Sequence, residues 1–173
     1  MVFVVLRFPY SRAIESFLHE VSQGRSVHLA VKRVDVSPLY ATAYLRDLRI
    51  EYEGVNIDIA EVRVKPRLTS LFSLKLEFTV MANSIKVGSA FIPVLYLSVG
   101  SAILKRQRDG WEIDDIHVIG KGLEARGKVY LYSMGHIRYE LKVKPSGVFY
   151  GILERLLPVD ASKGSWIEVK GKL

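Results

Sequence analysis

The feature that most constrains this chain is an alternation of apolar and polar residues that runs from Ser26 to Pro66 with the two-residue period of a β-strand. The alternation covers residues 27–36, 40–52 and 55–65, with turn residues, including Glu53-Gly54, between these segments. Because successive side chains of a strand point to opposite faces, one set faces a dry side and the other faces water. The stretch therefore predicts three long β-strands.

Each of these three segments contains a one-residue slip in its alternation. A slip of one residue turns the apolar set outward unless a local irregularity absorbs it. We therefore expect bulges or sharp local twists near Arg33, Asp47 and Glu61.

The rest of the chain continues in the same style. Further strands are predicted over residues 74–80, 85–92, 94–105, 111–119, 123–131, 137–143 and 166–172. Turn residues occur at Asn83-Ser84 and in the charged segment Lys105–Gly110. The fold class we predict is mainly β: an extended, curled antiparallel sheet, either a meander, a half-barrel or a taco-like shape, in a single β-rich domain over residues 11–173. Glycines and bulges bend strands and would produce the curl.

One amphipathic helix is predicted near the N-terminus, capped by Ser11 and ended by Gly24. Four apolar residues at helical spacing form its stripe and are expected to dock it on one end of the sheet: Ile14, Phe17, Leu18 and Val21. A second short helix is predicted between Ser146 and Pro158.

Residues 1–10 have two open interpretations. The apolar run Val2–Leu6 is far shorter than the roughly 20 residues that cross a bilayer. It is either a short buried strand or the remnant of a membrane anchor.

The charge balance favours an anionic partner, because 25 Lys and Arg stand against 18 Asp and Glu, for a formal charge of +7. Most of these basic residues alternate with apolar ones along strands, however. That arrangement is typical of a solvated sheet face that protects long strands from aggregation. The absence of cysteine excludes a disulfide framework and a thiolate metal site.

No cluster of residues predicts catalysis. Asp115 and His117 would share one face of a strand, but no third metal ligand stands near them in the sequence. The Gly-Lys-Gly of residues 120–122 lacks the spacing of a phosphate loop. The basic run Lys105–Arg108 contains no aromatic residue on which a base could stack. We predict no enzyme, no cofactor, no metal site and no nucleic-acid partner.

The order of the segments carries a resemblance to a known family. A stump that ends in Leu6-Arg7-Phe8-Pro9-Tyr10 precedes a helix, the strand pair 27–36 and 39–51, and the segments 55–66 and 68–74. This order resembles the periplasmic part of the type II secretion system protein N family and, more loosely, the AsmA-like proteins. The resemblance implies a bacterial inner-membrane anchor, a curled sheet in the periplasm, and a role in secretion or envelope assembly. For the AsmA-like relatives it implies lipid handling.

Two functions follow as expectations. The first, which we favour from the sequence because a sealed core is the commoner fate of an apolar face, is a structural module. It would bind other secretion or envelope proteins by pairing edge strands. The second is a lipid-binding or lipid-transfer module with phospholipid in an apolar groove. The residues predicted to line that groove are Leu74, Leu76, Phe78, Leu95, Leu97 and Leu131.

Overall fold

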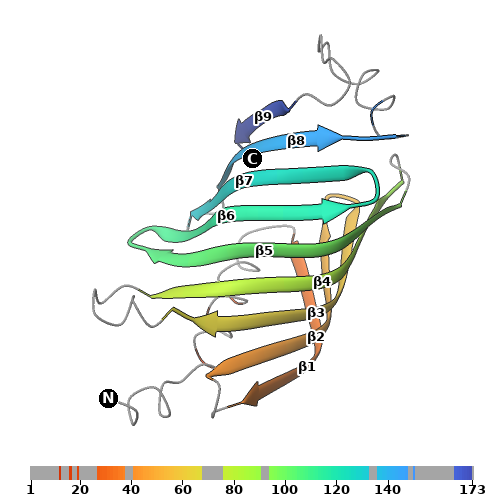
Figure 1. Ribbon diagram of the computed structural model, residues 1–173. Coiled ribbons are helices and arrows are strands. Elements are labelled where there is room, and N and C mark those ends of the chain that lie inside the picture. Colours follow the sequence, from red (N-terminus) through yellow and green to blue (C-terminus); the bar gives the residue numbers. More distant parts are fainter. Residues whose placement is uncertain are drawn as a thin grey trace.

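Nine β-strands form one antiparallel sheet in the computed structural model of the chain (Figure 1). The structure describes residues 12, 16, 19, 27–37, 41–67, 76–90, 94–132, 136–147, 150 and 166–172. The strands are β1 (Val27–Ser37), β2 (Thr42–Tyr52), β3 (Val55–Pro66), β4 (Glu77–Ser89), β5 (Leu95–Gln107), β6 (Gly110–Gly120), β7 (Leu123–Tyr132), β8 (Ile137–Pro145) and β9 (Ile167–Lys172). Their order in the sheet is their order in the sequence, so β1 and β9 are the two edges of the sheet that the described residues form.

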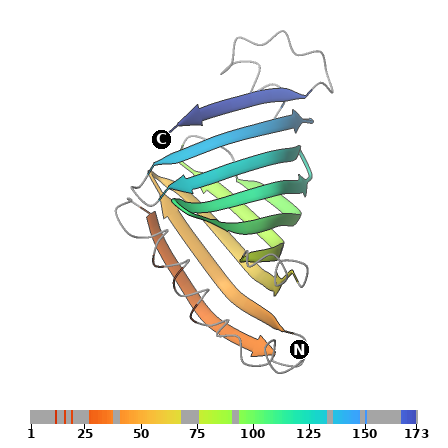
Figure 2. The ribbon, with the colours of Figure 1, turned by 90° about the vertical axis from the view of Figure 1, so that its left-hand side faces the viewer.

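The mainly β, antiparallel meander is thus confirmed, as one open sheet. A half-barrel or taco-like curl is not shown. The sheet is twisted, and Figure 2 shows the N-terminal strands running at a steep angle to the C-terminal ones.

Several predicted elements lie outside the described residues. These are residues 1–10, the helix-docking residues Ile14, Phe17, Leu18 and Val21, the groove residue Leu74, and the apolar residues of the predicted C-terminal helix. Among the described residues, no helix is both long enough and apolar enough to span a membrane.

The turn predicted at Glu53-Gly54 is confirmed as a tight hairpin. Tyr52 pairs with Val55, and the two residues between them have φ values of 46° and 80°. Positive φ at both central residues is the backbone that matches the twist of the flanking strands.

The slips in alternation form one line across the N-terminal half of the sheet. The pairing of strands omits one position in each of β1 to β5: Lys32, Asp47, Ala60, Ser84 and Ser98. Asp47, where we expected an irregularity, has φ of 52°, and the omitted positions in β1 and β3 are one residue away from the predicted Arg33 and Glu61. In the pairs from β1–β2 to β4–β5 these irregularities are not bulges, because the two strands of each pair leave out one residue each, at facing positions. Since neighbouring strands shift their alternation together, their apolar side chains stay on one face.

The prediction of a turn at Asn83-Ser84, between two separate strands, is wrong. β4 runs without interruption from Glu77 to Ser89, and Asn83 pairs with neighbours on both sides. Ser84 has φ of 54° and belongs to the line of omitted positions. The turn-forming residues therefore mark a left-handed backbone residue inside a strand.

Three register shifts with unequal numbers of residues lie in the two pairs that β6 forms. Two fall in the β5–β6 pair, between Leu97 and Val99 and between Ser101 and Ile103. The third falls in the β6–β7 pair, between Ile113 and Ile116. Asp115, which the second and third shifts share, has φ of 49°. These are bulges, and the alternation of residues along β6 did not predict them.

The sheet has one apolar face and one charged face. On the apolar face, buried residues form two clusters. The first cluster is Ala43, Leu45, Leu48, Val62, Ala82, Ile85 and Leu97. The second cluster is Phe78, Leu104, Trp111 and Leu131.

Candidate functional site: an apolar groove

The apolar face is hollowed by a groove of about 240 Å³ that spans five consecutive strands, β2 to β6. It lies where the first and second clusters meet. Every residue that lines it is apolar: Leu45, Leu48, Ile50, Ile59, Val62, Val64, Phe78, Val80, Ala82, Ala102, Leu104, Trp111 and Ile113.

The register of the strands explains the hollow. Two rows of paired residues cross the groove; the first contains small residues at the central strands β4 and β5, and the second contains one at β5. One row runs from Leu45 through Val62 and Ala82 to Gly100. The other runs from Val64 through Val80 to Ala102. Larger side chains on the flanking strands stand on either side, so the small residues form the floor.

One cation lies on the apolar face at the end of the groove. Arg106 stands directly opposite Trp111 in the β5–β6 pair, and its guanidinium carbon is 5.1 Å from the centre of the Trp111 ring. The Arg106 backbone N–H donates a 2.8 Å hydrogen bond to the carbonyl of Leu76. The groove thus combines an apolar channel with a positive charge at one end.

The five predicted groove residues that the structure describes do not come together in one place. Phe78 lines the groove. Leu97 belongs to the first cluster with Leu95 packed against it, while Leu131 belongs to the second. Leu76 precedes β4 and is 38% exposed.

Apart from Phe78, the residues that line the groove were not predicted from the sequence. Their alternation placed them on the apolar face but did not show which of them would surround a hollow. The alanines Ala82 and Ala102, small residues at inward positions of long strands, were the available signal.

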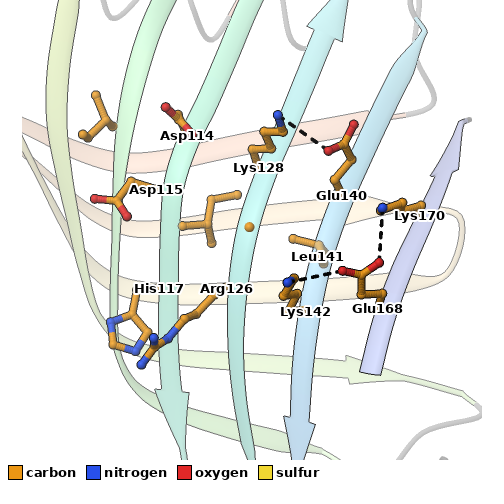
Figure 3. Close-up of a pocket in the computed structure, with 13 residues that line it drawn as sticks. Asp114, Asp115, His117, Arg126, Lys128, Glu140, Leu141, Lys142, Glu168 and Lys170 are labelled. Carbon is orange, nitrogen blue, oxygen red and sulfur yellow. Dashed lines mark ion pairs between the residues drawn. The ribbon is translucent and has the colours of Figure 1, made fainter. Parts of the chain in front are cut away.

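The opposite face of the sheet carries charged residues, and Figure 3 shows those of a broad surface pocket on β5 to β9. The Nε2 atom of His117 lies 3.1 Å from Glu124 on the neighbouring strand β7. Within the described part of the chain, no group of three or more His, Asp or Glu side chains could hold a metal ion.

Three glutamates on this face each sit between two cationic or basic side chains. Glu124 contacts His117 at 3.1 Å and Arg126 at 2.7 Å, and the hydrogen bond with His117, followed by that with Arg126, lowers the pKa of Glu124. Hydrogen bonds from the flanking lysines likewise lower the pKa of Glu168. Burial raises the pKa of Glu140, but the bonds and charges of its two basic neighbours outweigh this and lower it. All three carboxylates are therefore ionised at neutral pH.

Neither a protein-family model, nor a curated protein, nor a solved structure matches this chain. The resemblance described above therefore depends on the order of the sequence segments alone.

Proposed function

We propose that this protein is a lipid-binding module that holds an acyl chain in the apolar groove of β2 to β6. The observation that carries the proposal is the wholly apolar lining of a groove that extends over five strands. Transferring an acyl chain from water to such a surface is favourable by about 0.8 kcal/mol for each buried CH₂ group.

Arg106 supports an amphiphile with an anionic headgroup, such as a fatty acid or a phospholipid, because it places positive charge at one end of the channel. A curl of the sheet around the bound chain would extend the contact and belongs to the same proposal. The resemblance to envelope proteins supports a place at the bacterial inner membrane, facing the periplasm.

The proposal is tested by a substitution that enlarges a small residue on the floor of the groove. Ala102→Leu should weaken binding of a fluorescent fatty acid about tenfold, because the added methyl groups displace roughly two CH₂ groups of the ligand. Ala125→Leu is the matched control, since Ala125 pairs with Val118 on the same face but does not line the groove. A parent protein that binds neither fatty acid nor co-purifying phospholipid would refute the proposal, and so would equal binding by the two variants.

A second function is supported by the two edges of the sheet. Within the described residues, β1 has one strand neighbour, and its Val34 and Val36 are 45% and 41% exposed. Such an edge can accept a strand from another secretion or envelope protein. We expect the β1 amides to exchange hydrogen more slowly when such a partner is added. Unchanged exchange would remove the support for edge pairing.

A further inference from the structure

The charge of the sheet is concentrated on its last three strands. β7, β8 and β9 contain seven Lys and Arg against three Glu, a net charge of +4. β1 to β6 contain nine basic and nine acidic residues and are neutral in sum. All ten charged residues of β7 to β9 stand at even-numbered positions of regularly paired strands, so they share one face. We call the seven cations the basic face: Arg126, Lys128, Arg138, Lys142, Lys144, Lys170 and Lys172.

The pairing of β7, β8 and β9 places two pairs of cations directly opposite each other. Arg126 faces Lys142 across the β7–β8 pair, and Arg138 faces Lys172 across the β8–β9 pair. The other four pairs of facing charges in these strands have opposite signs. Like charges in direct opposition destabilise a sheet, so an anionic partner that lies over both pairs of cations would relieve a cost.

The carboxylates of this region do not neutralise it. Glu140 pairs with Arg138 at 2.7 Å and with Lys128 at 3.6 Å. Glu168 pairs with Lys142 at 3.3 Å and with Lys170 at 3.2 Å. Each glutamate is shared between two cations, and positive charge remains in excess. The side chains of Lys142 and Lys170 are 60% and 61% exposed and can reach a partner.

Aromatic residues accompany the basic face. The rings of Tyr130 and Tyr132 stack with centres 6.5 Å apart, and the Arg126 guanidinium lies 5.1 Å from the centre of the Trp166 ring. Tyr132 and Trp166 are each 39% exposed. Tyrosine and tryptophan beside lysine and arginine are the side chains that favour the headgroup region of a membrane.

We propose that the basic face is a docking surface for a bilayer that carries anionic lipid headgroups. A single-stranded nucleic acid fits less well, because it needs open aromatic faces for its bases. Here Lys128 and Arg138 lie over the Tyr130 ring, at 5.5 and 6.0 Å from its centre, and Arg126 lies over Trp166. The proposal is independent of the groove, since no residue of β7 to β9 lines it.

The experiment is co-sedimentation of the full chain with vesicles of phosphatidylcholine, with and without phosphatidylglycerol. The parent should bind only the anionic vesicles and should dissociate as salt is added. Lys142→Gln combined with Lys170→Gln should weaken binding roughly 30-fold, the effect expected from removing two cations at an anionic surface. Lys32→Gln combined with Arg33→Gln removes the same charge from ion-paired residues at the opposite edge and should leave binding unchanged.

Both double variants should keep the melting temperature of the parent, because all four side chains are exposed. Thermal unfolding verifies this. Binding of a soluble fatty-acid probe should be the same in the parent and in both double variants, which separates this surface from the groove. The proposal is overturned if the parent ignores anionic vesicles or if both double variants lose binding equally. Tighter binding of single-stranded DNA than of anionic vesicles at the same salt concentration would also overturn it.

Discussion

Gly127 occupies a backbone position in β7 that no other residue could take without strain. Its φ is 151°, and a Cβ atom at this position would collide with the carbonyl oxygen of Glu140 on β8. Gly127 also pairs with Ile116, directly after the bulge in β6. The glycine therefore allows β7 to accept an irregular strand on one side and a regular strand on the other.

We expect Gly127→Ala to lower the free energy of unfolding by roughly 1–3 kcal/mol, through backbone strain and the displaced β8 carbonyl. Urea denaturation measures this loss. Gly88→Ala is the matched control, because Gly88 does not have a left-handed φ and its nearest neighbour would be Val94 Cγ2 at 3.9 Å. This control should be neutral or slightly stabilising. Similar losses of unfolding free energy in both variants would show that the backbone conformation at Gly127 does not require glycine.

At the scale of elements, the β5–β6 pair is joined by a cross-strand ion pair close to the bulge. Lys105 Nζ lies 2.5 Å from Asp114 Oδ2, and both side chains are partly buried. The hydrogen bond between them raises the pKa of Lys105 and lowers the pKa of Asp114. The pair ties the two strands together beside the point where their register shifts.

The pH dependence of the stability that this ion pair contributes follows from the directions of the two pKa shifts. A lowered carboxyl pKa contributes stability above the unfolded value of about 3.9, and this is lost as the pH falls through the folded pKa. A raised lysine pKa contributes stability below about 10.4, which is lost as the pH rises through the folded pKa. The contribution should therefore be constant between about pH 5 and 9.

Asp114→Asn should reduce stability by about 0.5–1 kcal/mol at pH 7, a modest value because the pair is partly exposed. The difference from the parent should shrink as the pH falls below about 4, because the carboxyl group is then protonated in the unfolded state and, below its lowered folded pKa, in the folded state as well. Denaturant titrations of parent and variant at neutral and acid pH measure this. A difference in stability that stays constant at acid pH would contradict a stabilising role of the ion pair between Lys105 and Asp114.

The elements themselves were largely predictable. Two-residue alternation located eight of the nine strands, with ends mostly within two residues, because a half-buried strand imprints its period on the sequence. β4 was the exception, since Ser84 adopts a left-handed conformation within a strand. Residue types that favour turns also tolerate that conformation, so the local sequence does not separate the two cases.

At the scale of the whole molecule, the groove and the basic face were not predictable, because both depend on which residues stand opposite each other. The excess of basic residues was visible and was interpreted as a solvated face. Only the register shows that Arg126 faces Lys142 and that Arg138 faces Lys172. Likewise, among the described members of the predicted groove set, Phe78 alone lines the groove, because the floor depends on small residues of two paired strands.

Because each of the nine described strands pairs, within the described residues, only with the strands before and after it in the chain, the sheet is built in one dimension, as repeat proteins are. Each strand can add to the preceding one as it leaves the ribosome, without waiting for a distant segment. The same order makes length an evolvable property. Gaining or losing a hairpin at either edge would extend or shorten the sheet while every other pairing stayed as it is. Proteins built in this way could differ in strand number and still share the register that forms the groove.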